Sequence, residues 1–274
     1  MEASVSSFKV QNTNLTSYYW EAANPKAVVV IVHGMGEHAL RFENSVIKHL
    51  VNEGYSVVSY DNFGHGTTKG KQGHCPSYRA LQESVAQAIT EARALQPKIP
   101  VFLYGHSMGG NLVINYVLKN QPDLKGVIAT SPLLRLAFVP PKWKLSLGKL
   151  MLKIAPSVTL PSELDASGIS RDTNEVKRYQ EDPLVHDKIS PMYTFPVFDA
   201  GEYAINNADK LKVPLLLCHG TGDKITSHEA SKELANNSTM VNIKLFEDGY
   251  HELHHDLCAK ELVEVVVNWL NSKL

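Results

Sequence analysis

The chain has 274 residues, of which 43% are hydrophobic and 20% are charged, and its formal net charge is −1. This composition excludes disordered, collagen-like and coiled-coil proteins and predicts a globular protein with a substantial core. The near-zero charge argues against nucleic acid as a partner. The N-terminus lacks a basic segment followed by an apolar one, and three scattered cysteines form no disulfide framework. We therefore expect a cytoplasmic protein with reduced thiols.

Signals for strands and helices alternate along the chain. Residues 7–20 alternate loosely and carry Thr, Tyr and Val, which predicts two short antiparallel strands. The β-branched run 27–32 predicts a strand that is buried on both faces. The remaining pattern predicts strands at 55–60, 101–104, 126–130, 213–218 and 242–246, and helices at 42–52, 78–95, 111–119, 229–235 and 257–270. This alternation predicts the α/β class, with a doubly wound, mostly parallel sheet.

The alternation is interrupted by a proline-rich stretch that fits no strand–helix repeat. We expect residues 132–209 to form a cap over one edge of the sheet, and residues 1–131 and 210–274 to form the core. Within the cap, Lys142 to Ile154 carries an apolar stripe that includes Trp143, beside a row of lysines. This pattern is typical both of a helix that contacts a membrane surface and of a cap helix packed inward over an active site. The sequence leaves both open.

Residues 105–109 read Gly-His-Ser-Met-Gly and match the pattern G-x-S-x-G. A predicted strand runs directly into this motif and a predicted helix leaves it, which is the setting of a nucleophile elbow. Glycine at both ends lets the strand and the helix approach closely, so that the Ser107 hydroxyl can stand above the sheet. The alternative is a glycine-rich turn at which Ser107 only caps the helix. The strand–turn–helix context favours the nucleophile.

A serine hydroxyl becomes a good nucleophile only when an imidazole takes its proton and a carboxylate orients that imidazole. In this kind of sheet the acid and then the base follow the serine along the chain, on loops after later strands. Asp223 and His251 each follow a predicted strand and fit this order. Asp61 precedes Ser107, and Asp248 lies too near His251 in sequence. We therefore predict Ser107 as nucleophile, His251 as base and Asp223 as orienting acid.

The same histidine belongs to a second motif, because residues 251–255 contain the H-E-x-x-H signature of zinc peptidases. That signature requires both histidines on one helix and a third ligand. Gly249 and Tyr250 precede the first histidine, which predicts a loop there and favours serine chemistry without a metal or cofactor. A non-catalytic binding module is the alternative from another class, but the intact Ser, Asp and His set argues against it.

With these motifs in place, the chain resembles the monoacylglycerol lipase and lysophospholipase group of α/β-hydrolases over almost its whole length. The similar motifs are H-G-x-G-E-H at 33–38, Y-D-x-x-G-H-G at 60–66, G-H-S-M-G-G at 105–110 and the Tyr-His pair at 250–251. The resemblance implies a capped α/β-hydrolase that cleaves monoacylglycerol to fatty acid and glycerol through an acyl-enzyme. A lysophospholipase or a general carboxylesterase with the same triad is the alternative. Its partner would be a small lipid ester, with peripheral membrane contact through 142–154, and its oligomeric state is open.

The resemblance also implies an oxyanion hole made by the backbone N–H groups of Met35 and Met108. General reasoning agrees, because the residue after the nucleophile and a loop after an early strand commonly supply these donors. Such donors stabilise negative charge that appears only in the tetrahedral intermediate.

Four further residues are implied as substrate contacts. The resemblance assigns Glu37, Arg41 and His254 to a polar pocket for the glycerol end, and Tyr179 to a substrate-binding segment of the cap. For Glu37 and Arg41 the alternative is an ordinary ion pair at a helix start. The cap departs from the mammalian monoacylglycerol lipases after Leu184, and this departure bears most on substrate choice.

Overall fold

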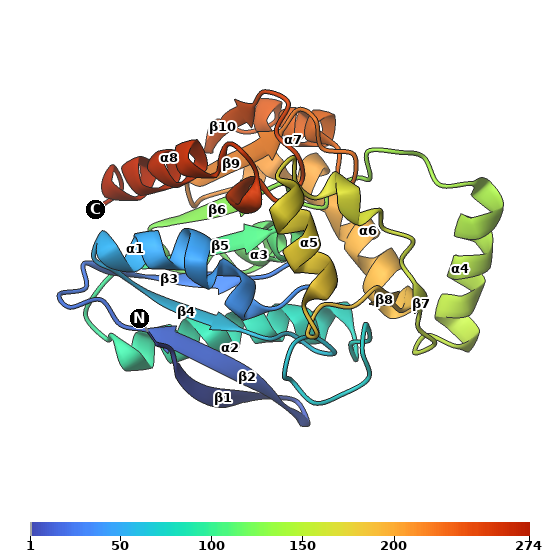
Figure 1. Ribbon diagram of the computed structural model, residues 1–274, viewed down its shortest axis with the longest axis horizontal. Coiled ribbons are helices and arrows are strands. Elements are labelled where there is room, and N and C mark those ends of the chain that lie inside the picture. The colour runs from blue at the N-terminus through green and yellow to red at the C-terminus, as the bar shows by residue number, and fades with distance from the viewer. Residues whose placement is uncertain (1) are drawn as a thin grey trace.

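An eight-stranded sheet runs through the middle of the computed structural model, which describes residues 2–274 (Figure 1). Its strand order is β1-β2-β4-β3-β5-β6-β9-β10; β1 and β2 pair antiparallel with their neighbours and the other strands are parallel. The strands are β1 Ser4–Val10, β2 Thr13–Trp20, β3 Ala27–Val32, β4 Tyr55–Tyr60, β5 Val101–His106, β6 Gly126–Thr130, β9 Leu215–Gly220 and β10 Val241–Phe246. The predicted doubly wound, mostly parallel sheet is confirmed.

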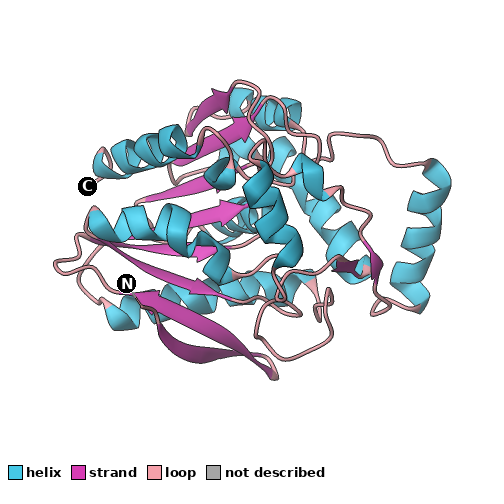
Figure 2. Ribbon diagram, in the orientation of Figure 1, coloured by secondary structure: helices cyan, strands magenta, loops and turns pink. Residues whose placement is uncertain are grey.

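Helices cover both faces of this sheet (Figure 2), and each face has its own apolar core. Strand β3 shows why its sequence is continuously apolar, since all six of its residues are buried. Val28 and Val30 pack in one core with α2 and α3, whereas Val29 and Ile31 pack in the other with α1 and α8. The covering helices are α1 Lys48–Asn52, α2 Tyr78–Leu95, α3 Met108–Asn120, α7 His228–Asn236 and α8 Ala259–Asn271.

The segment before β4 differs from its prediction as one regular helix over 42–52. It consists of a 3₁₀ turn at Ala39–Phe42, a π turn at Glu43–Ile47 and the short α1. The π turn widens the helix, and the irregular segment buries the Arg41 side chain as well as its apolar neighbour Phe42. A periodicity analysis detects the apolar stripe but not this change of helix type.

The predicted cap region supplies the elements between β6 and β9. They are α4 Lys142–Ile154, β7 Leu160–Pro161, a 3₁₀ turn at Ala166–Gly168, α5 Thr173–Glu181, β8 Lys188–Ile189, α6 Pro191–Asn206 and a 3₁₀ turn at Ala208–Lys210. In Figure 1, α5 lies beside the carboxyl ends of the strands, whereas α4 stands apart at the far right. The predicted helix over Lys142 to Ile154 is confirmed as α4. No helix within residues 2–274 combines the length and apolar character needed to span a bilayer.

The turn between β5 and α3 holds Ser107 in a strained conformation, with φ 53° and ψ −116°. A side chain at Gly109 would overlap the carbonyl oxygen of Val32, so α3 packs directly against the end of β3. Neighbouring segments hold the strained residue. Its N–H donates to the Thr130 carbonyl at 2.9 Å, and its own carbonyl accepts the N–H of Leu133 at 2.9 Å. Such strain persists only where the surroundings over-determine it.

Gly109→Ala should therefore lower the free energy of unfolding by about 1–3 kcal/mol, because the new methyl group forces the elbow apart. Chemical denaturation measured by circular dichroism checks this. The matched control is Gly168→Ala, where the nearest atom to a new Cβ lies 3.9 Å away. Equal stability of the two variants would contradict the close approach at the elbow.

Candidate active site

The structure brings Ser107, Asp223 and His251 together at the carboxyl ends of β5, β9 and β10. The Nε2 atom of His251 lies 3.0 Å from Ser107 Oγ, and its Nδ1 lies 2.8 Å from Asp223 Oδ2. An ionised carboxylate can only accept, so Nδ1–H donates to Asp223 and Nε2 is left to accept from the Ser107 hydroxyl. This is the arrangement in which an imidazole can take the serine proton.

The charges of this trio follow from burial and from mutual contact. Burial alone would lower the pKa of His251, but the adjacent Asp223 carboxylate outweighs it and raises that pKa above its ordinary value. Burial would likewise raise the pKa of Asp223, yet His251 and His219 hold it well below its usual range. Asp223 is therefore ionised at neutral pH.

Asp223 accepts hydrogen bonds on both oxygens. Its Oδ1 accepts the backbone N–H groups of Ile225 at 2.8 Å and Thr226 at 3.0 Å. Its Oδ2 lies 2.8 Å from the Thr226 hydroxyl and 3.1 Å from His219 Nε2, in addition to His251. Neither Thr226 nor His219 was singled out from the sequence. Their only signal was a position in the same strand–loop segment as Asp223.

The loop after β3 passes directly beside the nucleophile. A Cβ atom placed on Gly34 would lie 3.1 Å from the Ser107 Cβ. The Gly34 N–H donates to Glu37 Oε1 at 2.6 Å, and the next residue, Met35, has its sulfur 3.3 Å from His65 Nε2. Met108 follows Ser107 as the first residue of α3. Met35 thus lines the same cavity as Ser107, and Met108 is its neighbour in the chain.

A buried ionic network lies next to this loop, with Arg41 at its centre. Arg41 Nη2 donates to Glu252 Oε2 at 2.5 Å, and its Nε lies 3.5 Å from Glu37 Oε2. His255 Nδ1 lies 2.8 Å from the same Glu252 oxygen. The ion pair of Glu37 with Arg41, which was the alternative to a substrate-binding role, is present, but the shorter contact of Arg41 is to Glu252, 211 residues along the chain. The sequence indicated Glu252 only as part of the zinc motif.

The pKa values of the two carboxyl groups in this network, Glu37 and Glu252, are shifted in opposite directions. Burial raises the pKa of Glu37 to about 7, and the neighbouring charge of Glu252 adds to this effect against the opposing Arg41. Burial would also raise the pKa of Glu252, but Arg41 and His255 hold it well below its usual range. At neutral pH a proton therefore resides on Glu37 much of the time, whereas Glu252 is ionised.

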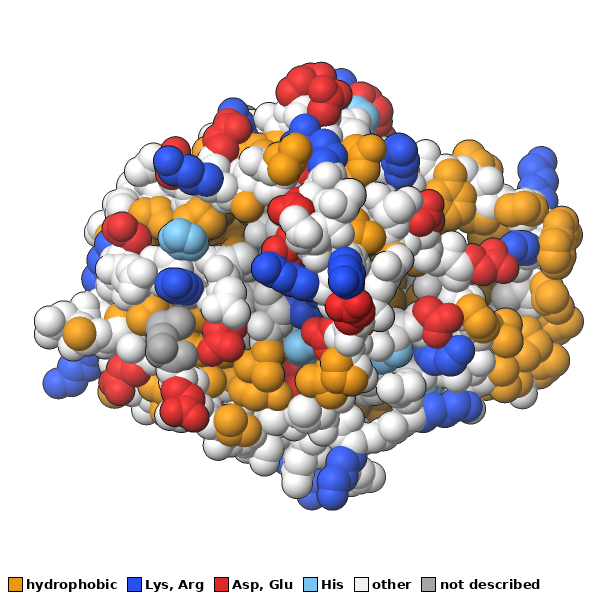
Figure 3. Space-filling view, in the orientation of Figure 1, with side chains coloured by type: hydrophobic (Ala, Val, Ile, Leu, Met, Phe, Trp, Pro, Cys, Tyr) orange, Lys and Arg blue, Asp and Glu red, His pale blue; other side chains and the backbone are white. Residues whose placement is uncertain are grey.

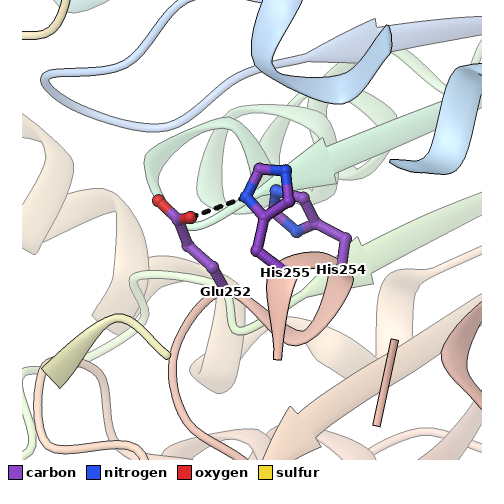
Figure 4. Close-up of side chains that lie close together, drawn as sticks. All are labelled: Glu252, His254 and His255. Atoms are coloured by element: carbon purple, nitrogen blue, oxygen red, sulfur yellow. Dashed lines mark hydrogen bonds and ion pairs between the residues drawn. The ribbon is translucent and has the colours of Figure 1, made fainter. Parts of the chain in front are cut away.

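The zinc motif does not form a zinc-peptidase site. Glu252, His254 and His255 lie close together, with possible ligand atoms within 4.8 Å of one another (Figure 4). However, the Arg41 guanidinium lies 3.2 Å from His255 Nδ1 as well as against Glu252, so a positive charge already occupies this position. His251 points instead toward Ser107, and residues 253–255 form a 3₁₀ turn rather than an α-helix. The arrangement is that of an ion-pair network.

The predicted substrate contacts divide between two neighbouring cavities. Glu37 and Tyr179 line a cavity of about 470 Å³ that also contains Ser107. Arg41 and His254 line an adjacent cavity of about 830 Å³. The His254 ring stacks on Phe42 with 4.5 Å between ring centroids. Burial lowers the pKa of His254 well below its ordinary value, so the ring is neutral.

The cavity around Ser107 combines an apolar lining with a few polar groups. The predicted cap region and the loops near it supply its apolar residues, which include Leu133, Leu136, Phe138, Leu164, Ile169, Ile189, Phe198 and Ile225. The loop after β3 and the histidine loop supply Glu37 and Glu252. A largely apolar cavity with a few convergent polar groups is typical of a small-molecule site.

A strained serine on a strand-to-helix elbow, bonded to a histidine that an aspartate orients, defines a serine hydrolase of the α/β-hydrolase class. Comparison with known families agrees. The model of the serine aminopeptidase S33 family matches residues 23–257, and the chain belongs to this family.

The chain is similar to monoacylglycerol lipases in sequence and in structure. It is 30% identical over 272 residues to the monoglyceride lipase homolog of Monkeypox virus, which covers 97% of this chain and 98% of that protein. The crystal structure of the Paleococcus ferrophilus monoacylglycerol lipase superposes with a TM-score of 0.87 at 36% identity, covering 95% of this chain and 99% of that one. The predicted resemblance to the monoacylglycerol lipase group and the α/β-hydrolase fold are confirmed.

A further relative is an uncharacterized abhydrolase domain-containing protein of Dictyostelium discoideum. It is 36% identical over 254 residues, or 91% of this chain. The match spans only 27% of the Dictyostelium protein, which is therefore several times longer than this chain.

Activity should fall as the pH drops, because His251 must be neutral to act as base. Since Asp223 raises the pKa of His251, the acid limb of the pH profile should lie above the ordinary histidine value of about 6.5. The measurement is kcat/KM for a short p-nitrophenyl ester between pH 5 and 9. Glu37→Gln removes a carboxyl group whose pKa is about 7, and this variant should keep the acid limb. Activity that stays constant down to pH 5 would exclude a histidine base.

Proposed function

We propose that this protein hydrolyses monoacylglycerols to a fatty acid and glycerol. The observation that carries the proposal is a single cavity of about 470 Å³ in which the Ser107–His251 pair, a largely apolar lining and the polar residues Glu37 and Tyr179 occur together. An acyl chain suits the apolar lining, and glycerol hydroxyls suit the polar residues. The similarity to proteins named monoacylglycerol lipases points the same way.

In the proposed reaction, Ser107 Oγ attacks the ester carbonyl while His251 Nε2 takes the serine proton. The backbone N–H groups of Met35 and Met108 stabilise the oxyanion of the tetrahedral intermediate. When the intermediate collapses, the histidine returns the proton to the leaving oxygen and glycerol departs. Water, deprotonated by the same histidine, then attacks the acyl-enzyme, and the histidine returns this proton to Ser107 Oγ as the fatty acid leaves. Asp223 orients His251 throughout.

The charges near the cavity favour glycerol over a phosphate-bearing leaving group. Arg41 is already engaged by Glu252 and Glu37, so it offers no free cation to a lysophospholipid phosphate. The ionised Glu252 would repel that phosphate. A carboxyl group that is partly protonated, as on Glu37, can both donate to and accept from a neutral hydroxyl. We assign Glu37 and Tyr179 to direct contact with glycerol. Arg41 and His254 would lie behind these two residues and hold them in position.

Glu37→Gln should lower kcat/KM for monoacylglycerol about ten-fold, as expected for the loss of one hydrogen bond from an ionisable group to the substrate. Hydrolysis of the methyl ester of the same fatty acid should change little. The glutamine oxygen can still accept the Gly34 N–H. Glu37→Ala would remove this hydrogen bond and would therefore also loosen the loop after β3, which carries Met35. Parallel steady-state assays on both esters provide the measurement.

Three outcomes are informative. Equal losses on both esters would reassign Glu37 to holding the loop after β3. Wild-type preference for lysophospholipid would replace the proposal with the lysophospholipase alternative. Equal wild-type rates on monoacylglycerol and methyl ester would indicate a general carboxylesterase.

We further propose that residues 132–209 act as a cap and that α4 rests on a lipid surface, which would make this a cytoplasmic enzyme working at a membrane. This is supported by the apolar stripe of α4, since Trp143 is 65% and Ile154 is 67% exposed and no residue of the helix is buried. Hydrophobic side chains gather at the end of the molecule where α4 lies (Figure 3). Its lysines would face anionic headgroups. The inward-packing alternative is disfavoured by this exposure, although Gly148 does lie against Phe195 of α6.

Replacing Trp143 and Leu147 with serine should weaken binding to anionic vesicles and slow hydrolysis of long-chain monoacylglycerol in those vesicles, because each apolar group loses about 25 cal/mol per Å² of burial. Hydrolysis of a short soluble ester should be unaffected. Vesicle sedimentation and the two assays test this. Leu257→Ser, at a residue 69% exposed outside the cap, is the control. Equal losses on both substrates would exclude the membrane role.

A further inference from the structure

A second histidine, His219, contacts the same oxygen of Asp223 as His251 does. His219 lies near the end of β9 and is completely buried. Its Nε2 lies 3.1 Å from Asp223 Oδ2, and its Nδ1 lies 2.7 Å from the hydroxyl of Ser231 on α7. Both ring nitrogens are therefore occupied, and the ring bridges the carboxylate to a helix behind the sheet.

The direction of these hydrogen bonds can be assigned. Burial lowers the pKa of His219, so the ring is neutral and carries one N–H. Nε2 faces the Asp223 carboxylate and, at 3.3 Å, the Thr226 carbonyl, and both of these can only accept. The Thr226 hydroxyl also lies 3.3 Å from Nε2, but it is closer to Asp223 Oδ2, at 2.8 Å, and donates there. The hydrogen is therefore on Nε2, and Nδ1 accepts from the Ser231 hydroxyl. Ser231 thus fixes the tautomer in which His219 donates to Asp223.

We propose that His219 is a positioning residue for the reaction, which acts through Asp223. It holds the carboxylate in the plane that His251 needs, and it withdraws part of the negative charge of Oδ2. The two imidazoles compete for this one oxygen, with His251 at 2.8 Å and His219 at 3.1 Å. His219 thereby limits how strongly Asp223 favours the protonated form of His251. The inference rests on the proposed roles of the triad.

The other ionisable groups near Asp223, His251 and His219 do not replace His219 as a hydrogen-bond donor to Asp223. The side chains hydrogen-bonded to Asp223 within residues 2–274 are those of His251, His219 and Thr226. The remaining groups act only through space. They are His106 at the end of β5, His228 on α7, the buried Glu37 and Arg41 of the loop after β3 and the turn that follows it, and Glu252, His254 and His255 of the histidine loop.

The test compares His219→Leu, which has no donor, with His219→Gln. The glutamine amide can donate to Asp223 and accept from Ser231, as the imidazole does. In the leucine variant Asp223 keeps more negative charge, so the imidazolium form of His251 is stabilised. The acid limb of kcat/KM for p-nitrophenyl butyrate should then move to higher pH. We expect kcat at the pH optimum to fall about ten-fold with little change in KM, and His219→Gln to restore most of both.

His228→Leu is the matched control, because its ring lies 6.3 Å from that of His219 without contacting Asp223. The His228→Leu variant should keep the wild-type acid limb of kcat/KM and the wild-type kcat. If the leucine variant does not fold, His219→Met removes the same donor with a more adaptable side chain. Equal loss in the leucine and glutamine variants with an unmoved acid limb would make His219 an ordinary core residue and overturn the proposal. Because a nitrophenyl ester is used, a wild type that hydrolyses this ester but not monoacylglycerol would refute only the proposed substrate.

Discussion

The strained conformation of Ser107 is the constraint on which the rest of the site depends. Its positive φ is unfavourable for a residue with a side chain, and the segments on either side of the elbow enforce it. Strand β5 lies between β3 and β6, so Gly109 meets the end of β3 while the N–H of Ser107 bonds to the end of β6. Ser107 is thus held by the central three strands, which are also among the most buried parts of the molecule.

The position of Ser107 determines what the neighbouring loops must do. Parallel strands bring their carboxyl ends to one edge, so the loops after β3, β9 and β10 all reach the serine. Each loop carries a polar group that is costly to bury, and for two of the three groups this cost is offset locally. Asp223 collects five donors, and Glu252 is offset by Arg41 and His255. The third group, Glu37, has the Arg41 Nε atom 3.5 Å away, but burial and the neighbouring Glu252 still raise its pKa to about 7, so it is partly protonated at neutral pH.

The features that could be predicted from the sequence are those whose information is local. The elbow occupies five consecutive residues, and the order of Asp223 and His251 after successive strands follows from the fold class. The pair of Arg41 with Glu252 could not be predicted, because the two residues are 211 positions apart. Each also had an interpretation from nearby residues, Arg41 as the partner of Glu37 and Glu252 as part of the zinc motif. His219 was one histidine among twelve, with no spacing rule to mark it. The division of the polar residues between two cavities likewise depends on side-chain packing at long range.

The proposed cap, residues 132–209, is attached unevenly to the rest of the molecule. Its inner segment is bonded to the histidine loop, since the Ile169 carbonyl accepts the Glu252 N–H at 2.7 Å and Arg171 pairs with the buried Asp256. Moving this segment would disturb the loop that carries His251. Helix α4, in contrast, buries none of its residues and stands away from the sheet. If α4 contacts the lipid surface as proposed, a change in α4 alters how a lipid enters while the geometry around Ser107 stays the same.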